Sequence, residues 1–306
     1  MRILITGGAG FIGSHLAEYF HQNAEVVILD NLKSGRRSNL DGIQHRFVEG
    51  DITDPSAVAE AVDGVNVVFH LAAMISVAES MDRPRECVET NGLGLLHVLE
   101  AASRAKARKI VLASSAAIYG DSPVVPKRED MLPEPKSPYA ITKLDGECYL
   151  EMFRRERKID SVSLRFFNVF GARQNPSSAY AAAIPAFMQR ALSGSDLMIY
   201  GDGEQTRDFV HVRDVVAALA HVASRSDLHG TFNVGYGKSM SVNRIASEII
   251  RLSGSSSRIV HLPERPGDVK HSQAAIDKLA ASGFVATGSV EQGLAETLEY
   301  FRSLHS

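Results

Sequence analysis

A tyrosine, a lysine and a pair of serines are the residues of this sequence whose types and spacing best suit chemistry. Tyr139 and Lys143 lie four residues apart near a predicted helix start, so both side chains project from one face. A phenol is a poor base at neutral pH, but an ammonium group one turn away favours the phenolate. Together with the Ser115 hydroxyl, the pair predicts a site that takes a proton from an alcohol while a cofactor takes hydride from the same carbon.

Spacing alone does not establish this site, because most Tyr-x-x-x-Lys pairs are neighbours on a helix surface. The interpretation gains weight from the elements that would position the pair. Ser114 and Ser115 follow an apolar stretch, Lys109 to Ala113, that is typical of a buried strand. Ligands bind at the carboxyl ends of parallel strands in open α/β sheets, which is where these serines would lie.

The N-terminal stretch predicts a dinucleotide site. A short apolar strand around Ile3 to Ile5 leads into Gly7, Gly10 and Gly13, and an amphipathic helix follows. Glycines let the backbone turn tightly and approach a pyrophosphate at the positive end of the helix. A tight turn that binds nothing is the alternative for such a triplet, but the strand before it and the helix after it favour the cofactor.

A second strand, Glu25 to Leu29, ends in Asp30, roughly 20 residues beyond the turn as a dinucleotide fingerprint requires. A carboxylate there accepts hydrogen bonds from ribose hydroxyls and repels a 2′-phosphate, which favours NAD over NADP. Arg36 and Arg37 lie close by in the sequence and could weaken this preference for NAD.

The first half of the chain alternates strands with helices, which predicts an α/β fold with a doubly wound parallel sheet. The further strands are expected at residues 45–49, 66–71, 109–113 and 162–166, and the helices at 55–62, 84–105 and 138–154. Beyond Gly171 the pattern changes. Helices at 180–192, 213–223 and 242–253, strands at 198–200, 231–234 and 258–262, and two C-terminal helices predict a smaller mixed α/β domain.

We therefore expect a NAD-binding domain over residues 1–170 and a substrate-binding domain over residues 171–306, with the active cleft between them. The boundary is soft, since the chain is expected to cross back more than once.

Composition excludes several function classes. The 306 residues are 44% hydrophobic and 23% charged, with a formal net charge of −3, which argues against nucleic-acid binding. No apolar run is long enough to cross a bilayer, and the N-terminus lacks the features of a signal peptide. Cys87 and Cys148, the only cysteines, fall in helical patterns and suggest reduced core thiols in a cytoplasmic protein. The eleven histidines show no metal-ligand pairing, so no metal site is predicted.

Taken together, the motifs resemble the extended short-chain dehydrogenase/reductase family, whose fold is Rossmann-type. Within that family the resemblance is greatest to the NAD-dependent nucleotide-sugar 4-epimerases of the UDP-glucose/UDP-galactose type. The stretches that carry the resemblance span nearly the whole chain: Thr6–Gly13, Asp30-Asn31-Leu32, His70–Ala73, Ser114–Gly120, Tyr139–Lys143 and Arg165–Gly171.

The resemblance implies a residue set for each ligand. For NAD it implies Gly7, Gly10, Phe11, Ile12, Gly13, Asp30, Asn31, Asp51, Ile52, Leu71, Ala72, Ala73, Asn91, Ser114, Tyr139, Lys143 and Phe167. For the nucleotide sugar it implies Ser115, Tyr139, Asn168, Arg207, Arg265, Asp268 and Ser272. Five of these residues have other interpretations from the sequence alone. Asp51 suits a turn or helix cap, and Asn91 suits a solvated position. Either arginine alone is more often a surface ion pair, and Ser272 suits the cap of a helix starting near Gln273.

Absences narrow the expected reaction. Related dehydratases and decarboxylases carry carboxylates beside the serine, whereas this chain has Ala116 and Ala117 there. Without a carboxylate, what remains is reversible oxidation at C4: Tyr139 takes the 4-hydroxyl proton, NAD takes the hydride, and the 4-keto sugar turns before hydride returns. The resemblance thus implies a UDP-hexose 4-epimerase with retained NAD. A nucleotide-sugar reductase or dehydrogenase is the alternative, followed by a non-catalytic NAD sensor.

Two departures from the family pattern concern the sugar. Many UDP-galactose epimerases carry Gly-Leu-Lys where this chain has Ala73-Met74-Ile75, so a lysine near the cofactor is lost. A small residue at Ser272 leaves room for a 2-N-acetyl group, so N-acetylated UDP-hexoses are plausible substrates. The family also implies a homodimer through the helices around Asn91 and Tyr139. Apolar residues there that would either line the dimer surface or face the sheet are Leu95, Leu96, Leu99, Leu144 and Leu150.

Overall fold

The computed structural model describes residues 1–157, 159–176, 182–264 and 269–304. Its chain forms two compact units, each of which draws on separated segments. The first unit consists of Met1–Ile118, Pro135–Phe166 and Val216–Phe232, and the second of Tyr119–Glu134, Phe167–Val215 and Asn233–Ser306. The roles of residues 1–170 in binding NAD and of residues 171–306 in binding the nucleotide sugar stay predictions.

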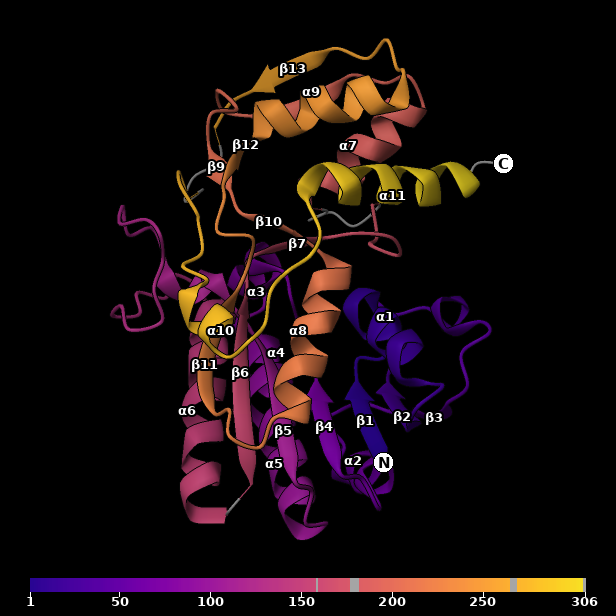
Figure 1. Ribbon diagram of the computed structural model, residues 1–306, viewed down its shortest axis with the longest axis vertical. Coiled ribbons are helices and arrows are strands. Elements are labelled where there is room, and N and C mark those ends of the chain that lie inside the picture. Colours follow the sequence, from indigo (N-terminus) through magenta and orange to yellow (C-terminus); the bar gives the residue numbers. More distant parts are fainter. Residues whose placement is uncertain (158, 177–181, 265–268, 305–306) are drawn as a thin grey trace. The chain divides into compact units, whose positions relative to one another are not determined.

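A seven-stranded sheet forms the centre of the first unit, in the order β11-β6-β5-β4-β1-β2-β3 (Figure 1). The strands are β1 (Arg2–Thr6), β2 (Glu25–Asp30), β3 (Arg46–Glu49), β4 (Val67–His70), β5 (Lys109–Ser115), β6 (Asp160–Phe166) and β11 (Gly230–Val234). From β3 across to β6, neighbouring strands pair in parallel. The chain order reverses beside β1, which has β2 on one side and β4 on the other.

Helices cover both faces of this sheet, which confirms the predicted doubly wound architecture. The α1 helix (Phe11–Phe20) and α8 helix (Val212–Ser224) lie on one face, and α2 (Pro55–Val62), α5 (Gly94–Arg104) and α6 (Pro138–Arg157) on the other (Figure 1). Phe20 of α1 packs on Phe69 of β4 with ring centroids 5.5 Å apart. The strand residues that alternate with Phe69 form a second apolar layer against α2, α5 and α6.

The long helix predicted over residues 84–105 is interrupted. It consists of α4 (Pro84–Val88), the π-helical turn η2 (Glu89–Leu93) and α5, and an unpredicted helix, α3 (Val77–Asp82), precedes it. A π-helical turn adds a residue to the helix and changes where its side chains point. Here it carries Asn91, whose side chain is buried rather than solvated.

Small sheets and helices make up the second unit. Its elements are β7 (Asn168–Phe170), α7 (Ala183–Leu192), β8 (Leu197–Tyr200), β9 (Thr206–Arg207), β10 (Phe209–His211), β12 (Met240–Ser241), α9 (Val242–Ser253), β13 (Ile259–Leu262), α10 (Asp277–Ala281) and α11 (Val290–Ser303). Their apolar faces form one core around Phe170, Phe209 and Phe301. The predicted helix 180–192 is described from Ala183, and Tyr180 lies outside the described residues.

Two predictions need correction. The strand predicted at 231–234 was assigned to the smaller domain, but β11 extends the large sheet beside β6, whose outer backbone groups need a partner. Cys87 is buried as expected, whereas Cys148 is exposed because it lies on the outward face of α6. Over the described part of the chain, no helix is both long and apolar enough to span a bilayer.

Lys109, at the start of β5, is fully buried and holds the end of α8. Its ammonium group donates to the carbonyl oxygens of Val222, Arg225 and Leu228. Hydrogen bonds from a charged donor are stronger than those from a neutral one. Burying the ammonium group without these partners would cost more free energy than the contacts of its side chain contribute.

We predict that Lys109→Met lowers the free energy of unfolding by about 2–4 kcal/mol, because three carbonyls lose a charged donor. Urea denaturation measures the change. Lys106→Met, at an exposed position three residues earlier, is the control and should stay within about 0.5 kcal/mol of the wild type. An equally small effect at Lys109 would contradict the assignment.

Candidate active site

The glycine turn lies at the point where the strand order of the sheet reverses. Gly7 follows β1 with φ +71°, a conformation that glycine adopts readily, and a Cβ atom there would lie 2.8 Å from the backbone nitrogen of Ala72. A Cβ on Gly13 would lie 2.2 Å from the Gly7 carbonyl oxygen. The turn and the end of β4 therefore approach each other more closely than any larger residue permits, and this cradle suits a pyrophosphate.

Asp30 ends β2 beside this turn, as predicted. One carboxylate oxygen accepts from the Ala9 backbone N–H at 2.9 Å and the other from Leu32 at 2.8 Å. Burial raises the pKa of the Asp30 carboxyl, and these two hydrogen bonds oppose the rise. The carboxylate is thus fixed where a ribose would be recognised, and each oxygen keeps a lone pair for a further donor.

Asp51 and Asn31 belong to adjacent loops and bind each other, with the Asn31 amide nitrogen 2.6 Å from the Asp51 carboxylate. The second Asp51 oxygen accepts from the backbone and hydroxyl of Thr53 at 2.9 and 2.7 Å. The turn-forming role expected of an Asp here is therefore present, and it does not exclude an additional contact to a cofactor.

The remaining residues of the predicted NAD set are spread over both units. Phe11 and Ile12 open α1, and Ile52 is buried against Gly94 of α5. Leu71, Ala72 and Ala73 follow β4, while Ser114 lies near the end of β5. Phe167 belongs to the second unit, where it is buried and donates its backbone N–H to Val234.

The predicted catalytic residues meet where β5 ends and α6 begins. The Ser115 hydroxyl lies near the Tyr139 phenol, whose pKa it lowers, and it accepts from the backbone N–H of Ala117 at 3.1 Å. The Lys143 ammonium donates to the Ala113 carbonyl oxygen at 2.8 Å. It also lies 5.7 Å from the centre of the Tyr139 ring. A base, its hydroxyl partner and a cation are therefore assembled by two elements of the first unit.

Burial controls the protonation of this set. It raises the pKa of the Tyr139 phenol, although the hydrogen bond from Ser115 acts against the rise. It lowers the pKa of the Lys143 ammonium to about 8, so this group is largely charged at neutral pH. Without further positive charge Tyr139 stays protonated, and a cofactor cation bound beside it would favour the phenolate.

The Asn91 side chain links its own turn, η2, to the loop at Met74 and to Thr142 of α6. Its amide oxygen accepts from the Met74 backbone N–H at 2.8 Å, and its amide nitrogen donates to the Met74 carbonyl and to the Thr142 hydroxyl at 3.0 and 3.1 Å. The expectation of a solvated Asn is wrong, because these partners compensate its burial. Its predicted contact with NAD stays a prediction.

His70 and Thr6 form a buried pair whose role the sequence did not reveal. The Thr6 hydroxyl accepts from the Ala72 backbone N–H at 3.2 Å and forms a hydrogen bond with His70 Nδ1, 3.0 Å away. Burial lowers the pKa of His70 to about 3, and the charge of Lys143 acts in the same direction. A neutral histidine therefore joins β1 to β4 beneath the glycine turn. A single histidine in an apolar strand is common, so the sequence pattern did not predict this hydrogen bond.

Three predicted substrate residues lie close together in the second unit. Asn168 of β7 pairs with Phe209 of β10, and the Asn168 backbone N–H donates to Asp208. Arg207 of β9 precedes Asp208, and Ser272 donates its backbone N–H to Thr206 at 3.1 Å. The segment 206–209 thus brings Asn168, Arg207 and Ser272 together. Arg265 and Asp268 lie outside the described residues.

Two further observations bear on this segment. Asp208, which sequence reasoning missed, is buried and accepts backbone N–H bonds from Tyr236, Gly237 and Ala274 at 2.8–3.0 Å. Burial raises its pKa to about 6 against these bonds. It ties two loops to the strand that carries Arg207. Capping of a helix near Gln273 by Ser272 is wrong, because α10 begins at Asp277.

The sheet, its strand order and the glycine cradle define a Rossmann-type dinucleotide-binding protein. The model of the NAD dependent epimerase/dehydratase family matches residues 3–235. A UDP-glucose 4-epimerase of Mycolicibacterium smegmatis is 36% identical over 99% of each chain. A UDP-N-acetyl-alpha-D-glucosaminuronate decarboxylase of Bacillus cytotoxicus is 34% identical over 100% of this chain and 99% of its own.

Among solved structures, a UDP-glucose 4-epimerase with UDP-glucose from Thermotoga maritima is 38% identical, with a TM-score of 0.96 and full coverage of both chains. The chain belongs to the NAD-dependent epimerase/dehydratase family, and it is an enzyme of that family. NAD is the family's cofactor, and the glycine cradle and the Asp30 carboxylate of this chain fit it.

The buried neutral His70 makes a testable contribution to stability. Its pKa is lowered on folding, so its contribution is complete above the pKa of an unfolded histidine, about 6.5, and is lost as the pH falls below that value. We predict that between about pH 6.5 and pH 5 the unfolding free energy falls more steeply in the wild type than in His70→Asn, by a difference that approaches about 1.4 kcal/mol per pH unit toward pH 5.

Urea denaturation at several pH values in this window measures both slopes. Asparagine retains a polar group for Thr6, and the surface carboxylates are the same in both proteins. Equal slopes would mean that His70 is charged in the folded state or already neutral in the unfolded one.

Proposed function

We propose that the enzyme is an NAD-dependent nucleotide-sugar 4-epimerase that inverts C4 of a UDP-hexose. One observation carries the proposal: a Tyr139–Ser115–Lys143 set with Ala116 and Ala117 directly beside it. A base, a hydroxyl and a cation suffice to oxidise and re-reduce a secondary alcohol. Elimination of water would need a further acid or base, and neither alanine supplies one.

The residues of this set divide the work. The Tyr139 oxygen takes the proton of the 4-hydroxyl, while the Ser115 hydroxyl holds the same sugar oxygen in line. The Lys143 charge stabilises the phenolate formed before each turnover. The cofactor's chemistry, when NAD is bound, is the uptake and return of the C4 hydride. Tyr139 finally gives its proton back to the 4-oxygen, so the protein ends in its starting state.

The second unit would hold the part of the substrate that does not react. A guanidinium fork suits a diphosphate, and Arg207 directly precedes Asp208, whose carbonyl oxygen accepts the Asn168 backbone N–H. Firm binding of the diphosphate leaves the sugar free to present either face after oxidation. The small Ser272 side chain extends the proposal to 2-N-acetylated UDP-hexoses. Arg265 and Asp268 stay predictions for the same clamp.

We predict that the purified protein, with no added cofactor, converts UDP-glucose or UDP-N-acetylglucosamine into the product with an axial 4-hydroxyl. Proton NMR of the sugar distinguishes the two epimers. Tyr139→Phe, the control, removes the base and should lower the rate by about 10²–10⁴-fold.

Other outcomes would identify the alternatives. Accumulation of NADH absorbance with added NAD would indicate a dehydrogenase, and carbon dioxide from UDP-glucuronate would indicate a decarboxylase. No conversion of either UDP-hexose, even with added NAD, would contradict the epimerase assignment and favour another nucleotide sugar or a sensor.

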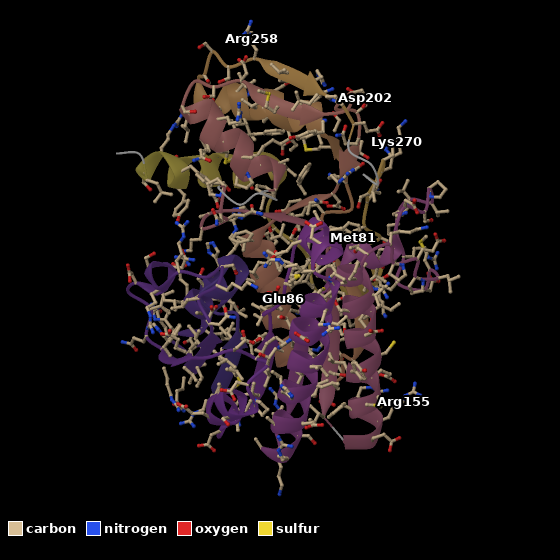
Figure 2. All side chains as sticks on the ribbon, turned by 180° about the vertical axis from the view of Figure 1, so that it is seen from behind. Met81, Glu86, Arg155, Asp202, Arg258 and Lys270 are labelled. Atoms are coloured by element: carbon tan, nitrogen blue, oxygen red, sulfur yellow. The ribbon has the colours of Figure 1, made fainter. Side chains whose placement is uncertain are left out.

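We also propose that the enzyme is a homodimer. Leu95, Leu99 and Leu150 do not supply its surface, because they are buried in the core of the first unit. Apolar side chains that are about half exposed lie instead on α4, η2 and α6, namely Val88, Leu93, Ile141 and Met152. Figure 2 shows this side of the first unit, with Glu86 labelled on α4 and Arg155 on α6. An apolar face on adjacent helices suits a second copy of the same face.

We predict that analytical ultracentrifugation finds twice the mass of the chain and that the Leu93→Glu/Ile141→Glu double variant sediments as a monomer. Two buried carboxylates without partners would oppose association. Leu132→Glu is the control, since Leu132 is 82% exposed and lies in neither helix. A monomeric wild type, or a double variant that still dimerises, would place the interface elsewhere or remove it.

A further inference from the structure

A buried ion pair lies directly behind the catalytic residues and takes no part in the proposed chemistry. Glu147 of α6 faces Arg165 of β6, with Nε to Oε1 at 2.9 Å and Nη2 to Oε2 at 2.7 Å. The two side chains are 8% and 5% exposed. Such a two-point contact fixes both planes. Buried ion pairs contribute little to net stability, so stability alone does not explain why this pair is present.

The pair also binds the strand that carries the catalytic serine. The Ser114 hydroxyl donates to Glu147 Oε1 at 2.6 Å, one residue before Ser115. The neighbouring residue in the other direction, Ala113, accepts from Lys143. Consecutive residues of β5 are therefore held by side chains one helical turn apart on α6. Tyr139 lies one further turn toward the start of the same helix, on the same face.

A glycine lets the helix come close enough for these contacts. A Cβ atom on Gly146 would lie 3.0 Å from a methyl group of Leu95 and 3.1 Å from one of Leu112. The helix therefore packs tightly against β5 and α5 at this level. This packing sets the distance of the helix from the sheet, and the hydrogen bonds to Ala113 and Ser114 add two directional contacts that fix its position along the strand.

We infer that Glu147, oriented by Arg165, is a positioning residue that fixes α6 along β5 and so keeps the Tyr139 hydroxyl beside Ser115. The inference deepens the proposed function and rests on it for the catalytic readout. Glu147 touches neither substrate nor cofactor in this account. It acts through Ser114 and through the register of the helix.

The decisive variant replaces the ion pair by apolar side chains of similar length, Glu147→Leu/Arg165→Met. Such replacements of buried ion pairs often keep or raise stability, whereas removing one partner leaves a buried charge. We expect the double variant of the holoenzyme to melt near the wild-type temperature, with kcat lowered about 10–100-fold and KM for the UDP-hexose within about threefold. A displacement of about 1 Å at a reacting group can produce such a loss.

A second readout does not depend on turnover. Carbon-13 labelling of the tyrosine ring lets NMR follow the ionisation of Tyr139, whose signal is assigned by its absence in Tyr139→Phe. Loss of the Ser115 hydrogen bond should move this titration upward by about 0.5–1 pH unit in the double variant. If the wild type converts no UDP-hexose but the titration moves, the proposed function fails while the positioning role stands.

Two further variants complete the test. Glu151→Gln, on the same helix in a surface pair with Arg154, is the matched control and should change neither kcat nor the titration. If the apolar double variant does not fold, Ser114→Ala decides, because it keeps the ion pair and removes its link to β5. It should lower kcat at least about threefold and move the titration in the same direction. A folded double variant, or failing that Ser114→Ala, with wild-type kcat and titration would overturn the inference.

Discussion

The buried ammonium of Lys143 constrains the centre of the first unit. Among the residues that the structure describes, no carboxylate pairs with this cation, and the Ala113 carbonyl oxygen accepts its hydrogen bond. Its charge has two consequences nearby. It opposes protonation of His70, which is neutral and joins β1 to β4. In the proposed function it would also supply the positive potential that a phenolate at Tyr139 requires. One charge, kept in place by strand backbone, would then serve both stability and chemistry.

The strand ends explain why groups distant in sequence meet there. All parallel strands present their carboxyl ends at one edge, so Gly7, Asp30 and Ser115 reach a common region although more than a hundred residues separate the first and last. The cradle is narrow because Gly7 and Gly13 permit backbone contacts that a Cβ atom would prevent. The fold therefore determines where the cofactor can lie before any side chain recognises it.

Local patterns predicted much of this arrangement. Strand ends, the glycine turn and the start of α6 follow from apolar runs, glycine and proline, whose effects extend over a few residues. The interruption of the long helix at Asn91 did not follow, because the Asn91 side chain bonds the backbone of Met74, 17 residues earlier, and no local pattern reveals that contact. The exposure of Cys148 and the edge position of β11 likewise depend on which neighbours the tertiary structure supplies. Glu147 continues the four-residue spacing of Tyr139 and Lys143. Its role could not be predicted from that spacing, because its partner Arg165 lies on β6.

The family relationship can be read in the same physical terms. Relatives of similar identity include an epimerase and a decarboxylase. A fold that serves both reactions suits a chemical step that the two reactions have in common. Oxidation of a sugar hydroxyl to a ketone is such a step. The oxidised carbon loses its stereochemistry, and the ketone activates a carboxylate on the neighbouring carbon toward loss as carbon dioxide. The outcome then depends on what else lies within reach of the oxidised sugar. In this chain Ala116 and Ala117 offer no proton donor or acceptor. Under the proposed function the oxidised sugar would therefore turn and be reduced again, and the reaction would be selected by what these two positions lack.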